Sequence, residues 1–202
     1  FFIILIPLVS LFFLELFLRW QSKPYVLEEK AAYEKKESEK ISPLDYDPEL
    51  GWIQKPNLKI SRYSEEFKSH YVYTNSFGMS DDEFNLKDDE EKIRILVIGD
   101  SHTQATGVST DDVWPNVLEN LFKLNNFDNV TVYNAAVEAY NVDQYLISLR
   151  RLKDKLKPHI VIIGFSLATD FYDVGRIDNN FVYGNNVGRT YFSLDEKNKL
   201  IE

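Results

Sequence analysis

The stretch Ile93-Arg94-Ile95-Leu96-Val97-Ile98-Gly99-Asp100-Ser101-His102-Thr103 decides the fold class of this chain. Its first six residues are mostly apolar and β-branched, which is typical of a parallel strand buried on both faces. In open α/β sheets the ligand crevice lies at the carboxyl ends of the strands, so Ser101 would stand in that crevice with its hydroxyl exposed. Its backbone N–H would point into the same crevice, as a nucleophilic serine requires.

Strand and helix patterns alternate after this stretch. Helical spacing of apolar residues runs from Asp111 to Asn125, and a second helix is predicted at Asp143–Lys155. Further strands are predicted at Asn129–Tyr133 and Ile160–Phe165. Alternation of this kind indicates right-handed crossovers and a parallel sheet, so we expect an α/β domain over residues 91–202. Three strands are few for such a sheet, and we expect the domain to be incomplete at its C-terminal end.

The remaining C-terminal residues predict a hairpin or an insertion. Its two arms would be Phe181-Val182-Tyr183 and Arg189–Leu194, with Asn and Gly residues between them. Upstream of the α/β domain, residues 45–90 predict a strand-and-turn segment that packs on it, with a strand at Tyr71–Thr74. The acidic run from Asp81 to Glu91 is expected to be exposed.

The N-terminal residues predict a membrane anchor. Phe1 to Leu14 is apolar apart from Ser10, and about 20 apolar residues span a bilayer. No small-residue cleavage site follows Leu18, and Arg19-Trp20 is typical of a membrane interface. We therefore expect a transmembrane helix over residues 1–20 and a charged stalk over 21–44, in a chain that begins inside a longer protein. A secretory signal segment and a buried core helix are the alternatives.

The composition excludes several classes of protein. A net formal charge of -9 over 202 residues argues against an electrostatic nucleic-acid binder, which needs a basic face. The chain has no cysteine, which excludes disulfide scaffolds, thiolate nucleophiles and thiolate zinc sites. His70, His102 and His159 show no metal-ligand spacing. We expect no metal, no cofactor and no nucleic-acid partner.

Four groups of residues resemble the SGNH (GDSL-like) hydrolase family, in particular its membrane-anchored bacterial branch. The nucleophile block of that family is similar to Gly99-Asp100-Ser101, followed by Gly107-Val108 and Trp114-Pro115. Its second block is similar to Tyr133–Tyr140 with Gln144, and its third to Lys157–Ile162 leading to Thr169-Asp170. The residues that precede these blocks in that branch are similar to Leu50-Gly51-Trp52, Pro56-Asn57 and Asn75–Gly78.

The resemblance implies a flavodoxin-like three-layer α/β/α fold and serine ester chemistry. Ser101 would be the nucleophile, and its N–H would belong to the oxyanion hole. The family adds a glycine N–H and an asparagine side chain, and these positions are Ala139 and Thr169 here. Asp170 would contact substrate or fix the loop after the third strand. The general base of the family is the histidine of an Asp-x-x-His motif, which would lie beyond Glu202, so residues 1–202 alone are expected to be inactive.

Each of these residues also has a structural interpretation. Ser101 could simply cap the helix that follows the strand. Asp100 is expected to be a hydrogen-bonding turn residue. His102 is expected to pack rather than to act as a base for Ser101, because neighbouring side chains usually diverge. His159 precedes its strand and is expected to be structural, at the opposite end of the sheet from Ser101.

Two functions of different class follow from these residues. The first is a serine esterase or O-acyltransferase that acts on acyl esters of a carbohydrate or lipid outside the cytoplasm, through an acyl-serine at Ser101. The second is a catalytically weakened member of the family, a binding module in envelope polysaccharide assembly, which Ala139 and Thr169 favour. A nucleotide-binding function is disfavoured, because the first strand is not followed by a phosphate-binding or dinucleotide-binding glycine loop.

Overall fold

The computed structural model describes residues 10–17, 43–64, 68–167, 169–170, 190, 192–197 and 199–201. The chain divides into two units, Phe1–Ser42 and Pro43–Glu202. In the first unit, residues 10–17 are helical and their large apolar side chains are exposed. No helix among the described residues is long and apolar enough to cross a membrane. The rest of the predicted anchor, residues 1–9 and 18–20, lies outside the described residues, as does most of the predicted stalk.

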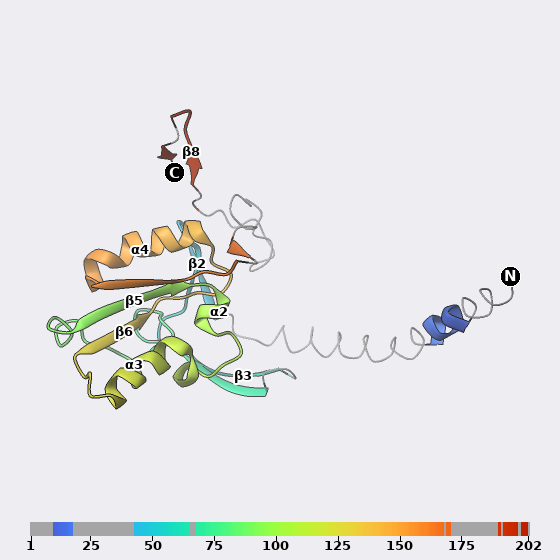
Figure 1. Cartoon of the computed structure of the whole chain (residues 1–202), viewed down its shortest axis with the longest axis horizontal. Coiled ribbons are helices and arrows are strands. Elements are labelled where there is room, and N and C mark those ends of the chain that lie inside the picture. The colour runs from blue at the N-terminus through green and yellow to red at the C-terminus, as the bar shows by residue number, and fades with distance from the viewer. Residues whose placement is uncertain are drawn as a thin grey trace. The chain divides into compact units, whose positions relative to one another are not determined.

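A three-stranded parallel sheet forms the centre of the second unit, as the alternating sequence predicts (Figure 1). Its strands are β5 (Ile93–Gly99), β6 (Val130–Asn134) and β7 (Ile160–Gly164). They lie in the order β6-β5-β7, and β5 pairs in parallel with both neighbours. Each strand lies within one or two residues of its predicted range, and the α/β class with a parallel sheet is confirmed.

The two long helices cover opposite faces of this sheet (Figure 1). On β5, Leu96 and Ile98 belong to the apolar core that includes side chains of α4 (Val142–Leu156), whereas Ile95 and Val97 belong to a second core. Leu118 and Phe122 of α3 (Trp114–Leu124) pack against that second core. Because successive residues of a strand point to opposite faces, the unbroken apolar run of β5 serves both cores.

Two further helices depart from the prediction. The range Asp111–Asn125 was expected to be one helix, but it divides into a 3-10 turn, η1 (Thr110–Asp112), and α3. The change falls next to Pro115, which occupies the first turn of α3, where a missing N–H leaves no helical bond unmade. A short helix that the sequence did not predict, α2 (Ser101–Gln104), follows β5 directly.

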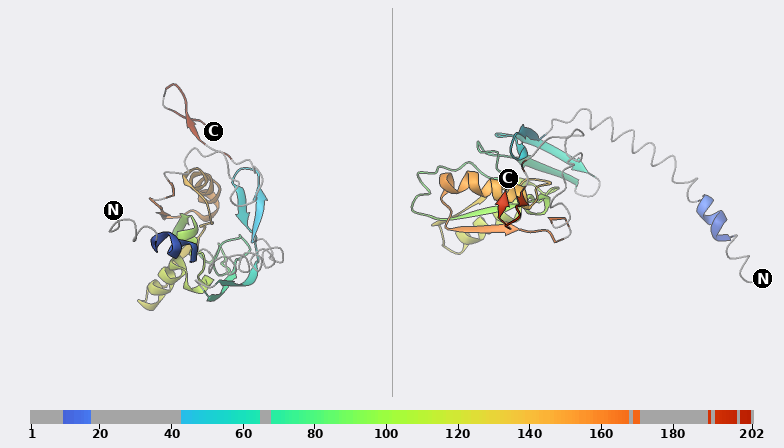
Figure 2. Two further views of the ribbon diagram at one scale, coloured as in Figure 1. Left: turned by 90° about the vertical axis from the view of Figure 1, so that its right-hand side faces the viewer. Right: turned by 90° about the horizontal axis from the view of Figure 1, so that it is seen from above.

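Two antiparallel hairpins precede the parallel sheet and do not extend it (Figures 1 and 2). β1 (Leu44–Asp47) pairs with β2 (Gly51–Gln54). β3 (Lys59–Ser64) pairs with β4 (Lys68–Tyr73), the only one of the four strands that the sequence predicted. A third, much shorter hairpin joins β8 (Ser193–Leu194) and β9 (Leu200–Ile201). The predicted arm at residues 181–183 lies outside the described residues.

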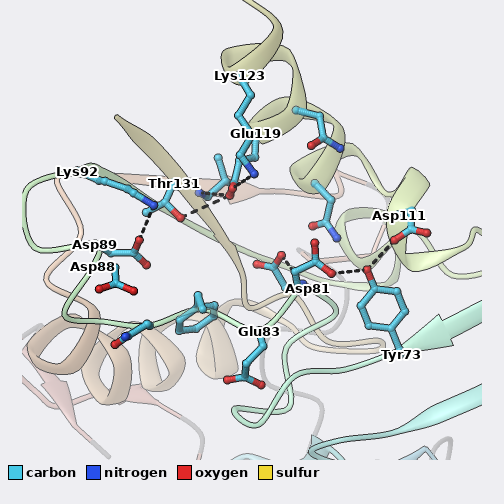
Figure 3. Close-up of a pocket in the computed structure, with 16 residues that line it drawn as sticks. Tyr73, Asp81, Glu83, Asp88, Asp89, Lys92, Asp111, Glu119, Lys123 and Thr131 are labelled. Carbon is cyan, nitrogen blue, oxygen red and sulfur yellow. Dashed lines mark hydrogen bonds and ion pairs between the residues drawn. The ribbon is translucent and has the colours of Figure 1, made fainter. Parts of the chain in front are cut away.

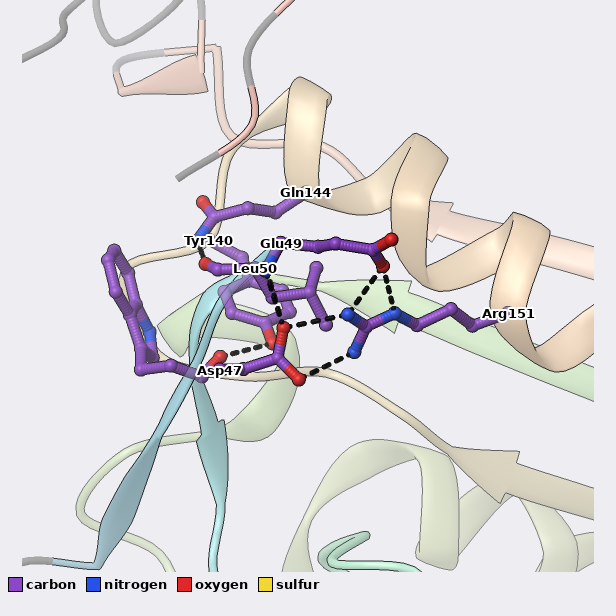
Figure 4. Close-up of polar contacts among 7 residues, drawn as sticks. Asp47, Glu49, Leu50, Tyr140, Gln144 and Arg151 are labelled. Carbon is purple, nitrogen blue, oxygen red and sulfur yellow. Dashed lines mark hydrogen bonds and ion pairs between the residues drawn. The ribbon is translucent and has the colours of Figure 1, made fainter. Parts of the chain in front are cut away.

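The guanidinium group of Arg151 bonds the β1–β2 hairpin to α4 (Figure 4). Arg151 of α4 donates from its Nη1 and Nη2 atoms to both carboxylate oxygens of Asp47, at 2.8 and 2.7 Å. It also donates from Nε and Nη2 to Glu49, at 2.8 and 2.5 Å. Asp47 in turn accepts from the backbone N–H groups of Glu49 and Leu50, which fixes the turn between the strands. These bonds join the β1–β2 hairpin to α4.

Several apolar side chains of β7 and of the residue that follows it are exposed to solvent. Ile160 is 47% exposed and Ile163 is 52% exposed, and Val161 and Phe165 are also exposed. No strand of the described residues pairs with the edge of β7 that faces away from β5. The strand carries no charged side chain, although natural edge strands are commonly protected by lysine or proline.

Candidate active site

The four predicted site residues all lie beyond the carboxyl ends of the strands of the parallel sheet. Ser101 follows β5, Ala139 follows β6, and Thr169 and Asp170 follow β7. Because the strands are parallel and adjacent, their carboxyl ends lie at the same edge. From the central strand β5, the chain passes first to β6 on one side and then to β7 on the other. This reversal of strand order is where open α/β sheets form a ligand crevice.

Ser101 is the first residue of α2, and Asp100 caps that helix. The Asp100 side chain is buried and accepts a hydrogen bond from the backbone N–H of His102 at 2.9 Å. This contact confirms Asp100 as a turn residue. Ser101 is partly buried, and among the described residues its hydroxyl makes no hydrogen bond, to His102 or to any other side chain.

Two glycines let α2 lie directly against the strand ends. Gly99 and Gly164 are paired on β5 and β7, and the side chain of Thr103 lies over both. A Cβ atom added at Gly99 would lie 2.5 Å from the Thr103 Cβ, and one added at Gly164 would overlap the Thr103 Oγ1. The Thr103 hydroxyl is 3.5 Å from the Gly164 carbonyl oxygen. The glycine before Asp100 therefore allows α2 to pack closely against the strand ends.

The expected packing role of His102 is wrong. Its side chain is 71% exposed, and its Nδ1 lies 3.1 Å from the Asp100 Oδ2. The imidazole is turned outward because the Asp100 carboxylate holds both its ring and its backbone N–H. His159 has the expected structural role, since its Nδ1 accepts from the Arg94 N–H at 3.0 Å next to the amino end of β7.

The loop after β6 holds Ala139 in a strained conformation. Ala139 has φ +60°, in the left-handed region that favours glycine. The indole N–H of Trp52 donates to the Glu138 carbonyl at 2.9 Å, and the Tyr140 hydroxyl donates to the Trp52 carbonyl at 2.7 Å. Contacts on both sides of Ala139 thus fix its backbone. The resemblance places a glycine at this position, and the alanine keeps the backbone geometry that a glycine would adopt.

Asp170 and Thr169 have different surroundings although they are adjacent. Asp170 is only 1% exposed, and its carboxylate accepts from the Tyr145 hydroxyl at 3.1 Å and from the Ser166 N–H at 2.8 Å. Burial, followed by the charges of Asp100 and Asp170, raises the pKa of Tyr145, so its hydroxyl remains a donor. These contacts are those of a residue that fixes the loop after β7. Thr169 is exposed. The role of Thr169 as an oxyanion donor stays a prediction, and so does the contact of Asp170 with substrate.

A polar cavity of about 390 Å³ lies elsewhere, between residues 81–92, α3 and β6 (Figure 3). None of the predicted site residues lines it. Lys92 pairs with Asp89 at 2.8 Å, and Lys123 pairs with Glu119 at 2.6 Å. Among the described residues, no three His, Cys, Asp or Glu side chains are grouped so that they could hold a metal ion.

The expectation that residues 81–91 are exposed is wrong for two of the carboxylates beside this cavity. Asp89 is buried and accepts from the Tyr133 hydroxyl at 2.9 Å. Asp81 is buried and accepts from the backbone N–H groups of Asp82 at 2.8 Å and Asn134 at 3.3 Å. Burial raises the pKa of Asp81 to about 7, with a further contribution from the charge of Glu119. The segment is therefore anchored to β6 by its acidic side chains.

No protein-family model matches the chain, and no curated protein sequence matches it significantly. The resemblance to the SGNH family consequently depends on the residue blocks themselves and stays a prediction.

Proposed function

We propose that this protein is a serine esterase or O-acyltransferase of the SGNH type, acting on acyl esters of a carbohydrate or lipid. The observation that supports this most is the position of Ser101. It follows the central strand where the strand order reverses, on a helix that two glycines allow against the sheet. In the finer fold that we propose, a flavodoxin-like α/β/α sandwich, this is the nucleophile position.

The proposed reaction has two steps. The Ser101 Oγ attacks the acyl carbonyl carbon, its proton passes to a general base, and the alkoxide leaving group departs with that proton. Water, in the hydrolase, or a sugar hydroxyl, in the transferase, then attacks the acyl-serine and gives its proton to the base. The bond between the acyl carbon and the Ser101 Oγ breaks, the base returns the proton to the Oγ, and the acid or the new ester leaves. The resemblance supplies the base as a histidine C-terminal to residue 202. The N–H groups of Ser101 and Ala139 and the Thr169 hydroxyl would stabilise the oxyanion.

A fluorophosphonate probe tests this proposal in the full-length protein. Such a probe forms a phosphorus–oxygen bond to an activated serine and releases fluoride. We expect labelling of the full-length protein and none of its Ser101→Ala variant, which lacks the attacking oxygen. Absence of labelling in a folded, complete protein would exclude the enzyme and leave the binding module, for which the exposed Thr169 in place of an asparagine is the supporting observation.

The Thr169→Asn variant tests the third oxyanion donor. Loss of one well-placed donor lowers the rate by about a hundredfold, so restoring the longer amide should raise the labelling rate by up to that factor. Labelling without any gain from Thr169→Asn would mean that Thr169 does not occupy the asparagine position of the family.

We also propose an extracytoplasmic, membrane-anchored location, with the apolar residues 1–18 as the anchor. Carbonate extraction of membranes from expressing cells is the measurement. The full-length protein should stay in the membrane fraction. Recovery in the soluble fraction, or a mature N-terminus just after residue 20, would indicate a cleaved signal segment.

A further inference from the structure

Gln54, at the end of β2, is a buried amide in a hairpin that lies outside the parallel sheet. Its side chain is 3% exposed. A buried amide is destabilising unless hydrogen bonds compensate for lost water. The Gln54 Nε2 donates to the Ala136 carbonyl at 3.1 Å. Its Oε1 accepts from the Ser80 hydroxyl at 3.0 Å and from the Gln104 Nε2 at 2.9 Å.

Two of these partners belong to the segments that carry the candidate active site. Gln104 is the last residue of α2, the helix that begins at Ser101. Ala136 lies three residues before Ala139, in the loop after β6. One side chain therefore bonds the nucleophile helix through its oxygen and the Ala139 loop through its nitrogen. The amide can do both at once because a carboxamide carries a donor nitrogen and an acceptor oxygen on one planar group.

Neighbouring residues of the same hairpin make further contacts to this loop. Trp52 and Gln54 lie on the same face of β2, two residues apart. Trp52 bonds on either side of Ala139, through the Glu138 carbonyl and the Tyr140 hydroxyl. Figure 4 shows the adjacent contact, in which the Gln144 Nε2 donates to the Leu50 carbonyl at 2.7 Å. Such contacts hold a non-glycine residue at positive φ, which a free loop would relax.

We propose that Gln54 is a positioning residue that sets the spacing between the Ser101 helix and the N–H of Ala139. The proposal rests on the proposed serine chemistry. Oxyanion donors act only when they stand at hydrogen-bond distance from the developing charge, and a displacement of about 1 Å can lower a rate by a hundredfold. Gln54 touches neither substrate nor the reacting atoms, and it acts through the two segments that it joins.

The test compares Gln54→Met with Arg151→Met in the full-length protein. Methionine keeps the length of the glutamine but makes none of its three hydrogen bonds. Arg151 fastens the same hairpin to α4 without contacting α2 or the Ala139 loop, so its variant controls for general loosening of the hairpin. The readout is the rate of fluorophosphonate labelling, separated into probe affinity and the bond-forming step, with the urea unfolding midpoint measured alongside.

We expect Gln54→Met to slow the bond-forming step by about tenfold or more with little change in probe affinity. Arg151→Met should remain within about twofold of the wild-type protein. Gln54→Met at the wild-type rate, or an equal decrease in both variants, would overturn the positioning role. A wild-type protein that is not labelled at Ser101 would instead contradict the proposed function, so the two failures are distinguishable.

Gln54→Glu gives a second test should the methionine variant fail to fold. A protonated glutamate donates to the Ala136 carbonyl as the amide does, whereas an ionised one repels it, and burial favours the protonated form. The labelling rate of Gln54→Glu relative to the wild-type protein should therefore rise as the pH is lowered from about 8 to about 5.5. A ratio that does not change with pH contradicts the proposal.

Discussion

At the scale of single residues, Ala139 combines a predicted role with a strained backbone. The left-handed conformation is unfavourable by about 1–2 kcal/mol for a residue with a Cβ, and glycine avoids most of this. Glycine in turn loses about 0.5–1 kcal/mol in chain entropy on folding. The difference between these effects determines what a substitution at this position does.

We expect Ala139→Gly to raise the free energy of unfolding by about 0.5–1 kcal/mol, since strain relief exceeds the entropic loss. Urea unfolding measures this. Ala135→Gly, in the same loop without a positive φ, is the control. It should lower the free energy of unfolding by about 1 kcal/mol or more, because it also removes a buried methyl group. Equal destabilisation by both substitutions would show that φ at Ala139 is not a source of strain.

At the scale of elements, the placement of α2 depends on two glycine–threonine contacts that differ in kind. At Gly164 an added Cβ meets mainly the Thr103 Oγ1, while the Thr103 Cβ is 3.1 Å away. At Gly99 the Thr103 Cβ itself is 2.5 Å away. Thr103→Ala removes the hydroxyl and the methyl group but keeps the Cβ. It therefore makes room for a Cβ at Gly164 and not at Gly99.

We expect Gly164→Ala to destabilise the protein by about 1–3 kcal/mol and Thr103→Ala to recover part of that loss in the double variant. Gly99→Ala should be at least as destabilising, with no recovery from Thr103→Ala. A double-mutant cycle by urea unfolding measures both couplings. Strict additivity at Gly164 would mean that α2 moves away from the sheet rather than clashing with it.

Some of the helices and strands could be predicted from the sequence, and others could not. β5, β6 and β7 were predicted because each is a short run rich in β-branched apolar residues, and α4 because its apolar residues have helical spacing. β3 was missed because Lys59–Ser64 mixes charged, apolar and hydroxyl residues without alternation, and β1 and β2 have only four residues each. The four-residue helix α2 has no periodicity, since it depends on the Asp100 cap and on room left by glycines on two strands.

Some features of the candidate site could likewise be predicted from the sequence, and others could not. The positions of Ser101, Ala139 and Thr169 beyond the sheet edge followed from their places after predicted strands. The outward turn of His102 and the bridging contacts of Gln54 did not. Both depend on side chains brought together from distant segments, with Gln54 and Gln104 separated by 50 residues. The spacing of Asp100 and His102 at the start of a helix is a sequence signal that could have indicated this contact.

At the scale of the whole molecule, Asp81 links stability to pH. Its pKa is about 7 in the folded protein, whereas 3.8 is the value of an unperturbed aspartate. Between these values the folded protein binds more protons than the unfolded chain, so this carboxyl makes the free energy of unfolding fall as pH rises. Its stabilising contribution is complete below pH 3.8 and is lost as pH passes through 7.

We expect Asp81→Asn to flatten this dependence. The wild-type protein should lose on the order of 2–4 kcal/mol more than the variant between about pH 4 and pH 8. Chemical denaturation across that range measures it, and Asp88→Asn, an exposed carboxylate in the same segment, is the control. The asparagine lacks one acceptor for the two backbone N–H groups, which lowers stability equally at every pH. Parallel curves for the wild-type protein and Asp81→Asn would contradict the burial of this carboxyl.

The open edge of β7 leaves a signature in hydrogen exchange. In a parallel strand, successive backbone N–H groups point alternately to the two sides. Every amide of the central strand β5 therefore faces a neighbouring strand, whereas every second amide of Ile160–Gly164 has no partner strand among the described residues. Residue-resolved amide exchange should show uniform protection along β5 and a protected–unprotected alternation along β7. Anything that binds this edge by adding a strand would remove the alternation, which makes these amides a direct reporter of such binding.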